Sequence, residues 1–285
     1  MPRIAHLSDP HFAAITYSLS QFFSKRWLGN SNLILFRQKT LHQKQLAELP
    51  KLLKSFELAA VCITGDLATT SLSEEFEKGA DFVRSLKDEG LRVFLLPGNH
   101  DFYTKESEKS KRFYTFFPSQ SDPFSLKDDR IECHFLGEGW WWVSLDTALA
   151  TSVIFSNGKF FKEIEDKLYQ VLSSIPPNER IIIGNHFPLY KSGSPRHYLW
   201  RCGRLQEILK SFPNVKLYLH GHDHSPYQID KQKEGFPLVF CAGSCSQMPQ
   251  GFFNTYDLTE NDCRFVQYTW NGNDWVENSS KIFSI

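Results

Sequence analysis

The sequence has no excess of charge of either sign. Its 285 residues contain 32 lysines and arginines and 32 aspartates and glutamates, so the formal net charge is zero. Bulk electrostatics therefore cannot drive sequence-independent capture of a polyanion, and general nucleic-acid binding is not expected. Apolar residues make up 41% and charged residues 22% of the chain. This mixture is typical of a globular protein and excludes a disordered chain or a polytopic membrane protein.

Targeting and crosslinking features are also scarce. Residues 1–9 lack the apolar core of a signal peptide, and no apolar run is long enough to span a bilayer. None of the six cysteines belongs to a C-x-x-C pair, which favours buried, reduced thiols over a disulfide framework. Both observations lead us to expect a cytoplasmic protein.

The chain contains no repeat, low-complexity stretch or Pro/Gly/Ser-rich linker, and we expect one domain over residues 1–285. Short apolar runs predict buried strands at 3–7, 59–64, 91–96, 141–145, 180–184, 215–219 and 238–242. Amphipathic stretches between them predict helices at 40–56, 73–89, 159–173 and 201–211. This alternation indicates an α/β fold. The C-terminal part, 236–285, is β-rich, with predicted turns at 259–262 and 271–272.

The segment 12–47 has an unusual composition. It contains no Asp or Glu, and it carries five basic residues together with several aromatic and aliphatic side chains. One interpretation is a helical hairpin that packs on the core with its basic ends extended into water. The other is a basic aromatic insert that lines the rim of a site for an anionic substrate or touches anionic lipid.

Polar side chains follow five of the predicted strands. They are Asp9 and His11, then Asp66, then Asn99, His100 and Asp101, then His186, and finally His222, Asp223 and His224. The carboxyl ends of strands in an α/β sheet border a common crevice, so we expect these side chains to converge. Carboxylate, amide and imidazole donors suit Mn, Fe or Zn, and they do not suit Ca or a thiolate cluster.

Seven of these residues are candidate metal ligands, namely Asp9, His11, Asp66, Asn99, His186, His222 and His224. Seven ligands are too many for one tetrahedral ion and suit two divalent ions that share a bridging carboxylate. Two ions about 3.5–4 Å apart activate a water and bind two phosphoryl oxygens during in-line displacement. The sequence therefore predicts phosphoester hydrolysis with two divalent metal ions, Mn being favoured and Fe or Zn being alternatives.

In this pattern the chain resembles the calcineurin-like binuclear metallophosphoesterases. The family blocks D-x-H, G-D, G-N-H-[DE], H and G-H-x-H are present in order as Asp9-Pro10-His11, Gly65-Asp66, Gly98-Asn99-His100-Asp101, His186 and Gly221-His222-Asp223-His224. The resemblance implies a four-layer sandwich of two mixed sheets flanked by helices. It also implies that Asp66 bridges the two ions.

The resemblance implies a role for each of the matched residues. Asp9, His11, Asp66 and His224 would hold one ion, and Asp66, Asn99, His186 and His222 would hold the other. His100 would give a proton to the leaving-group oxygen or stabilise its charge, and Asp101 would orient His100.

Several residues outside the blocks have two interpretations. His197 lies after the His186 block with Arg196, Arg201 and Arg204, where these side chains could reach a second phosphate or a ribose, or could simply be solvated. His220 is expected to pack or hydrogen-bond behind the ligands. Trp140, Trp141 and Trp142 are expected in a core strand rather than on a base-stacking surface.

The favoured function is a metal-dependent phosphodiesterase acting on a small phosphoester, similar to the bacterial cyclic-nucleotide phosphodiesterases. The alternative is a nucleotide-lipid pyrophosphatase similar to the UDP-2,3-diacylglucosamine hydrolases, which would give the 12–47 insert a purpose and a peripheral place at the inner membrane surface. That branch has Arg where this chain has His100. A protein phosphatase has no supporting regulatory segment, and the intact ligand set counts against a non-catalytic scaffold.

Overall fold

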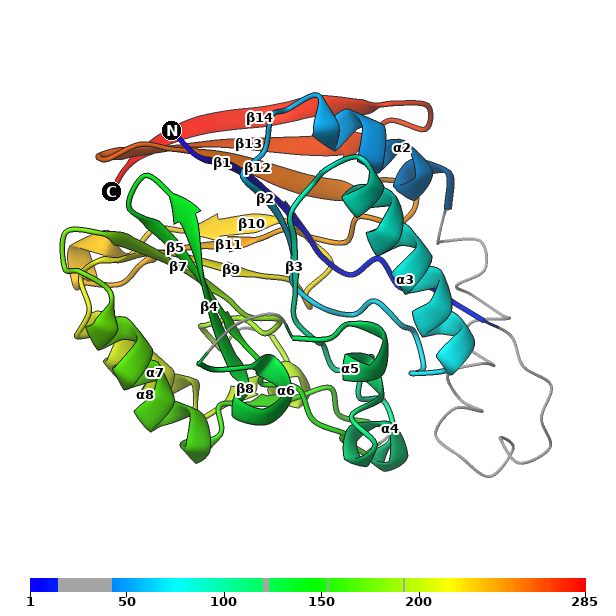
Figure 1. Ribbon diagram of the computed structural model, residues 1–285, viewed down its shortest axis with the longest axis horizontal. Helices are drawn as coiled ribbons and strands as arrows, with labels where there is room; N and C mark the ends of the chain where they lie inside the picture. The colour runs from blue at the N-terminus through cyan, green and yellow to red at the C-terminus, as the bar shows by residue number, and fades with distance from the viewer. Residues whose placement is uncertain (15–42, 120–122, 153, 192) are drawn as a thin grey trace.

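The computed structural model describes residues 1–14, 43–119, 123–152, 154–191 and 193–285 (Figure 1). The chain forms two six-stranded sheets. The first sheet has the order β14 (Trp275–Ser284), β13 (Asp262–Trp270), β12 (Phe252–Leu258), β1 (Arg3–Leu7), β2 (Ala60–Ile63) and β3 (Val93–Leu95). The second has the order β10 (Tyr227–Ile229), β11 (Leu238–Cys241), β9 (Val215–His220), β7 (Arg180–Gly184), β5 (Trp140–Leu145) and β4 (Ile131–Gly137).

Both sheets are mixed. In the first, β1, β2 and β3 are parallel, and β12 pairs antiparallel with β1 so that the C-terminal strands continue the sheet from the N-terminal one. In the second, β5, β7, β9 and β11 are parallel, with β4 and β10 antiparallel at the two edges. The parallel strands of both sheets are buried, which explains their continuous apolar sequences.

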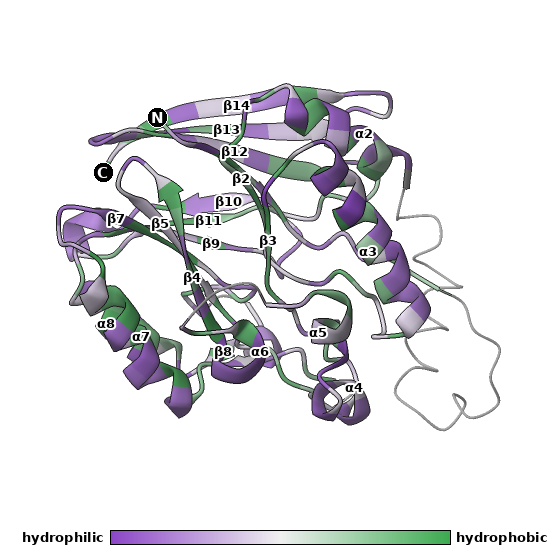
Figure 2. Cartoon of the chain, in the orientation of Figure 1, coloured by the Kyte–Doolittle hydropathy of each residue, from purple (hydrophilic) through white to green (hydrophobic). Residues whose placement is uncertain are grey.

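Helices cover the outer faces of the two sheets (Figure 1). Helices α2 (Gln43–Lys54) and α3 (Ser73–Asp88) lie beside the first sheet, and α7 (Lys162–Ser174) and α8 (Cys202–Lys210) lie beside the second. Shorter elements complete the described part of the chain: α4 (Lys105–Lys109), α5 (Arg112–Phe116), α6 (Leu126–Asp129), β6 (Gly158–Lys159), η3 (Pro195–His197), β8 (Leu199–Trp200) and η4 (Gln232–Glu234). Figure 2 shows that the covering helices carry both hydrophobic and hydrophilic residues, as expected for helices with one face on a sheet.

Helix α3 shows how the sequence sets such an element. Phe76, Val83 and Leu86 recur at helical spacing and are buried against the first sheet. The buried Glu75 carboxylate accepts the backbone N–H of Leu72 at the start of the helix, at 3.1 Å. The helix ends at Asp88, and the chain turns away at Gly90, whose φ of +83° is a left-handed conformation that favours glycine.

The predicted strands and long helices are confirmed within a few residues at each end. The predicted C-terminal turns join β12 to β13 and β13 to β14. The edge strand β4 and the four- or five-residue helices α4, α5 and α6 were not predicted, because such short or half-polar segments show little periodicity. Most of the 12–47 segment, residues 15–42, lies outside the described residues, and both interpretations of it stay predictions.

Tryptophan and cysteine behave as the sequence indicates. Trp140 and Trp142 are buried in β5, and Trp141 is half-buried against the core. All six cysteines are free, and five of them are buried. Among the described residues, no helix combines the length and apolar character needed to cross a membrane.

Phe240 joins the two sheets. It lies on β11 of the second sheet with 0% exposure, and its ring contacts Tyr256, Phe265 and Phe283 of the first sheet at centroid distances of 5.1, 5.1 and 5.5 Å. Aromatic contacts of this kind stabilise the interface beyond the burial of area alone.

We expect Phe240→Ala to lower the free energy of unfolding by about 3–5 kcal/mol, because it opens a cavity between the sheets. Urea unfolding followed by fluorescence measures this loss. Phe135→Ala, at a phenylalanine that is 45% exposed, serves as the control and should cost less than about 1 kcal/mol. Equal losses in the two variants would contradict a joining role for Phe240.

Candidate metal centre

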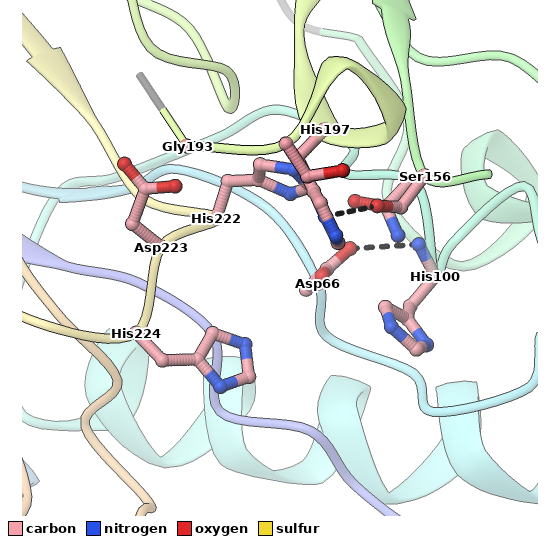
Figure 3. A pocket seen from close by; sticks show the side chains of 10 residues that line it. Asp66, His100, Ser156, Gly193, His197, His222, Asp223 and His224 are labelled. Atoms are coloured by element: carbon pink, nitrogen blue, oxygen red, sulfur yellow. Dashed lines mark hydrogen bonds between the residues drawn. The ribbon is translucent and has the colours of Figure 1, made fainter. Parts of the chain in front are cut away.

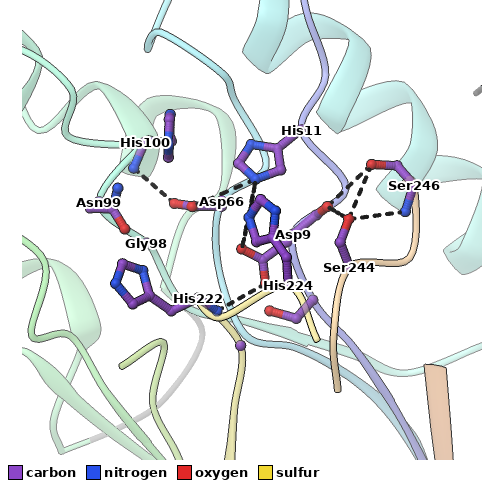
Figure 4. A network of polar contacts seen from close by, with 12 residues as sticks. Asp9, His11, Asp66, Gly98, Asn99, His100, His222, His224, Ser244 and Ser246 are labelled. Atoms are coloured by element: carbon purple, nitrogen blue, oxygen red, sulfur yellow. Dashed lines mark hydrogen bonds and ion pairs between the residues drawn. The ribbon is translucent and has the colours of Figure 1, made fainter. Parts of the chain in front are cut away.

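The candidate ligands converge where the parallel strands of the two sheets end (Figure 4). From the first sheet, β1 leads to Asp9 and His11, β2 leads to Asp66, and β3 leads to Asn99. From the second sheet, β7 leads to His186, and β9 leads to His222 and His224. Both sheets therefore contribute to one centre, as the strand-end pattern predicts.

Five of the seven candidate ligands have left-handed backbone conformations. The φ angles are +54° at Asp9, +47° at His11, +57° at Asp66, +71° at His222 and +57° at His224. Each such conformation costs a non-glycine residue about 1–2 kcal/mol. Residues in strained conformations of this kind concentrate at functional sites, where the surrounding contacts hold them.

Three glycines of the sequence blocks allow the loops to approach one another. A Cβ atom on Gly65 would lie 2.7 Å from the Gly98 nitrogen and 2.7 Å from His186 Nδ1. A Cβ on Gly98 would overlap Asp66 Oδ1, and one on Gly221 would overlap Ser8 Oγ and Asp9 Oδ2. Glycine is therefore required at these three positions, because any larger side chain would displace a candidate ligand.

One half of the centre contains Asp9, His11, Asp66 and His224, whose ligand atoms all lie within 4.8 Å of one another. His224 Nε2 is 3.2 Å from Asp9 Oδ1 and 3.0 Å from His11 Nε2. His11 Nε2 in turn is 3.8 Å from Asp66 Oδ2. Donor atoms this close, aimed at a common point, are arranged as metal ligands are.

The other half contains Asp66, Asn99, His186 and His222. His186 Nε2 lies 3.1 Å from Asn99 Oδ1, 3.4 Å from Asp66 Oδ2 and 3.3 Å from His222 Nδ1. Since Asp66 Oδ2 is within 4 Å of both His11 and His186, the Asp66 carboxylate stands between the two halves. That is the position that a bridging ligand requires.

Two of the histidines, His11 and His222, are in the protonation state that cation binding requires. Burial holds the pKa of His11 and of His222 well below the usual value, so both rings are neutral and carry a lone pair. The His186 ring is oriented by its Nδ1 atom, which donates to the Thr64 carbonyl oxygen at 2.7 Å, so Nε2 is left to face Asp66. Burial alone would lower the pKa of His186, but the carboxylates of Asp66 and Asp9 raise it to about 9.

The carboxylates are ionised at this centre. Burial acts to raise the pKa of Asp9 and of Asp66, but the surrounding histidines outweigh it and lower both values. Among the described residues, three buried atoms of the centre, Asp9 Oδ1, His11 Nδ1 and His222 Nε2, lack a hydrogen-bond partner. Buried carboxylates and unpartnered donor atoms are costly without a compensating cation, so this set of residues fits divalent metal ions.

His100 and Asp101 have different surroundings. His100 donates its backbone N–H to Asp66 Oδ1 at 2.8 Å, and its Nδ1 atom pairs with the Thr69 carbonyl oxygen at 2.6 Å. The Asp101 carboxylate accepts backbone N–H groups of Leu67, Ala68 and Gly98. Through these bonds Asp101 ties together the loops that carry Asp66 and Asn99. That Asp101 also orients the His100 ring stays a prediction.

A cavity of about 430 Å³ opens beside the centre. Besides Asp66, Asn99, His100, His222 and His224, its lining consists of Ser156, Gly193, Ser194, His197 and Asp223 (Figure 3). Of these, His197 and Asp223 were named from the sequence. Ser156 and Ser194 belong to no motif, and the sequence offered no signal for them.

Two of the three arginines considered for a second phosphate form ion pairs with a glutamate. Arg201 and Arg204 both form ion pairs with Glu165 of α7, and Arg196 is not among the residues that line the cavity. Glu165 lies 36 residues before Arg201, so local sequence could not reveal this pairing. Of the two interpretations of Arg196, Arg201 and Arg204, these contacts do not support the one in which they reach the substrate.

His220 supports the loop that carries His222. Its ring is fully buried, and its Nδ1 atom pairs with the Gly221 carbonyl oxygen at 2.9 Å. Cys241 Sγ donates to the same oxygen at 3.4 Å. The expectation that His220 packs and hydrogen-bonds behind the ligands is confirmed.

Comparison with known proteins identifies the family. The calcineurin-like phosphoesterase family model matches residues 2–226 of the chain. The protein belongs to the calcineurin-like phosphoesterase family. This is a family of binuclear metal enzymes, and the structure contains a cluster of candidate ligands for such a centre.

Curated members of the calcineurin-like phosphoesterase family show partial similarity. The 3',5'-cyclic adenosine monophosphate phosphodiesterase CpdA of Haemophilus influenzae is 27% identical over 193 residues, which cover 67% of this chain and 63% of that protein. CpdA of Escherichia coli K12 is 27% identical over 195 residues, covering 67% of this chain and 62% of that protein. The chain thus matches less than two thirds of the length of these relatives.

Solved structures confirm the calcineurin-like phosphoesterase fold. A dimetal phosphatase from Danio rerio superposes with a TM-score of 0.70 at 15% identity, over 99% of this chain and 98% of that one. The purple acid phosphatase PPD1 from yellow lupin gives a TM-score of 0.66 at 12% identity, over 99% of this chain and 53% of that one. The expected arrangement of two mixed sheets flanked by helices is confirmed.

We expect Gly221→Ala to reduce bound Mn²⁺ from about two ions per chain to below about one, because the added methyl displaces the Asp9 carboxylate. Metal analysis of dialysed protein measures the stoichiometry. Gly203→Ala is the control, since nothing lies within 4 Å of the position that its Cβ would take. Full occupancy in Gly221→Ala would contradict the steric requirement.

Proposed function

We propose that the protein is a metal-dependent phosphodiesterase that hydrolyses a small phosphodiester. The observation that carries the proposal is the Asp66 carboxylate, which stands between two groups of imidazoles, 3.8 Å from His11 and 3.4 Å from His186. A shared carboxylate with ligands on both sides is the signature of a binuclear hydrolytic site. The adjoining cavity gives a substrate access to it.

The seven candidate ligands would hold two divalent ions in the arrangement that the family implies. When bound, such ions lower the pKa of a water and stabilise charge on phosphoryl oxygens. Their identity is proposed as Mn²⁺, with Fe or Zn as alternatives, because the donors are carboxylate, amide and imidazole groups without a thiolate.

His100 would assist the departure of the leaving group. Its Nδ1 atom pairs with the Thr69 carbonyl oxygen, which can only accept a hydrogen bond, so Nδ1 carries a proton. His100 lines the cavity, so Nε2 of the same ring would transfer the proton to the leaving oxygen, and for this step Nε2 must carry a second proton on the ring. The backbone N–H bond to Asp66 keeps His100 next to the metal ligands.

Cyclic nucleotides are the first candidate substrates, since the CpdA relatives are described as 3',5'-cyclic adenosine monophosphate phosphodiesterases. The alternative, a nucleotide-lipid pyrophosphatase, would have to bind a second phosphate. Among the described residues that line the cavity, none is lysine or arginine. This observation favours a substrate with a single phosphate.

The expected compartment is the cytoplasm, and the free thiol state of all six cysteines agrees with a reducing environment. Contact with the inner membrane surface through 12–47 stays a prediction, because residues 15–42 of that segment lie outside the described residues.

The central experiment assays metal-stripped protein that has been reloaded with Mn²⁺. We expect it to hydrolyse bis-p-nitrophenyl phosphate faster than p-nitrophenyl phosphate, and cyclic AMP and UDP-diacylglucosamine tested in parallel should separate the two substrate classes.

Asp66→Asn should lower kcat by at least about 10³-fold, because the bridging charge is lost. Asp81→Asn, at an exposed aspartate of α3, is the control and should keep full activity. Normal turnover by Asp66→Asn would refute the two-metal site.

His100→Ala should keep metal stoichiometry and lower kcat by about 10²–10⁴-fold for diesters with poor leaving groups. The loss should shrink as the phenol leaving group becomes more acidic, because a good leaving group needs no proton. A series of substituted phenyl phosphodiesters measures this dependence. His134→Ala, which replaces a histidine outside the cavity, should show no change with leaving group. A uniform loss across the series would contradict proton transfer by His100.

A further inference from the structure

We propose that one side of the cavity is a binding subsite for an uncharged, hydroxyl-bearing group attached to the reacting phosphate. This side, called here the polar wall, consists of Ser156, Ser194, His197 and Asp223. The proposal rests on the proposed phosphodiesterase function and adds residues that recognise the part of the substrate that does not react. None of the four residues belongs to the candidate ligand set.

The polar wall is held by its own framework. Strand β6 pairs in parallel with β8, away from the two large sheets, and so joins the segments that carry Ser156 and His197. Buried Asn157 donates through Nδ2 to the carbonyl oxygens of Pro195 and Tyr198, at 2.9 and 3.0 Å. The Ser156 backbone N–H donates to the Arg196 carbonyl oxygen at 2.9 Å. Two loops about 40 residues apart in sequence are therefore fixed against each other, and a subsite requires such preorganisation.

His197 is positioned at the end of this framework. It is the last residue of η3, whose N-cap Ser194 accepts the Arg196 backbone N–H at 3.3 Å. Its Nδ1 atom lies 2.6 Å from Ser156 Oγ, and its ring centroid is 5.7 Å from that of His222 (Figure 3). The imidazole therefore faces the cavity beside a candidate metal ligand, where a group bound to the reacting phosphate would lie.

The charges around the polar wall select against a second phosphate. Arg201 and Arg204 both form ion pairs with Glu165, and Arg204 also pairs with Glu207. The Lys191 amino group lies over the Tyr198 ring, 5.8 Å from its centroid. The wall itself contains the Asp223 carboxylate, which accepts the Tyr227 hydroxyl at 2.7 Å. A carboxylate repels another anion and accepts a hydrogen bond from a neutral hydroxyl. Two serine hydroxyls and an imidazole add donors and acceptors that match a sugar-like group.

The test uses diesters that share one leaving group, p-nitrophenolate, so that only the second substituent changes. The substrates are methyl p-nitrophenyl phosphate, phenyl p-nitrophenyl phosphate, thymidine 5'-(p-nitrophenyl phosphate) and the same thymidine ester with a 3'-phosphate. We expect the wild-type protein to prefer the thymidine ester with a free hydroxyl over all the others. Replacing that hydroxyl by phosphate should lower kcat/KM by about tenfold or more, as in sites built to pair with a hydroxyl.

His197→Ala and Ser156→Ala should each lower kcat/KM for the thymidine ester about tenfold, mainly through KM, because one hydrogen bond to the substrate is lost. Both variants should stay within about twofold of wild type on the methyl ester. The matched control is Arg196→Ala, at an exposed residue of the same short helix that does not line the cavity. It should leave every substrate ratio unchanged.

A binding measurement separates failure of the subsite from failure of the proposed function. Calorimetry on Mn²⁺-loaded protein should show thymidine 5'-monophosphate bound more weakly by His197→Ala than by wild type, with inorganic phosphate bound equally by both. No hydrolysis of any diester by the wild type would refute the phosphodiesterase function. Three other results would refute the subsite. They are equal losses of kcat/KM on all substrates in the two variants, unchanged nucleotide binding in both variants, and a wild-type preference for the ester with the 3'-phosphate.

Discussion

The close approach of three loops is the constraint on which the rest of the site depends. The Asp66 carboxylate lies where a side chain on Gly98 would be, and the Asp9 carboxylate lies where one on Gly221 would be. Asp101 adds hydrogen bonds to this close packing. Its buried carboxyl group accepts backbone N–H groups from both the Asp66 loop and the Gly98 loop. Burial and the Asp66 charge raise the pKa of Asp101 to about 8, because both disfavour the ionised form of its carboxyl group. Loops fixed in this way can hold several ligands in strained left-handed conformations.

The centre concentrates charge in a protein that has none overall. Two ionised carboxylates, Asp9 and Asp66, are buried among imidazoles, of which burial keeps His11 and His222 neutral. Such a cluster is unfavourable in isolation and becomes favourable when cations complete it. Metal binding and stability of the ligand loops are therefore coupled, and the neutral net charge of the chain conceals a strongly polarised site.

The sequence predicted the parts of the molecule in which local residues determine the result. Buried parallel strands need continuous apolar runs, so β1, β7 and β9 were located almost to the residue. The candidate ligands were recognisable because each follows a strand. Pairings between distant segments were not predictable, as the Arg201 contact with Glu165 and the Asp101 contacts with backbone N–H groups illustrate. The polar wall was not predicted for the same reason, because Ser156 and Ser194 are brought together only when β6 pairs with β8.

The place of β1 in the first sheet has a consequence for how the protein is made. Arg3 pairs with Asp257 across the antiparallel contact of β1 and β12, so the strand that leads to Asp9 and His11 is completed on one side by residues near the other end of the chain. Contacts with so large a sequence separation form late, because the entropy of closing the intervening loop must first be overcome. During synthesis the N-terminal ligands emerge first, yet they are locked in place only after β12 has left the ribosome. Assembly of the metal centre is thereby tied to completion of the sheet, and a chain interrupted before β12 would lack a finished site.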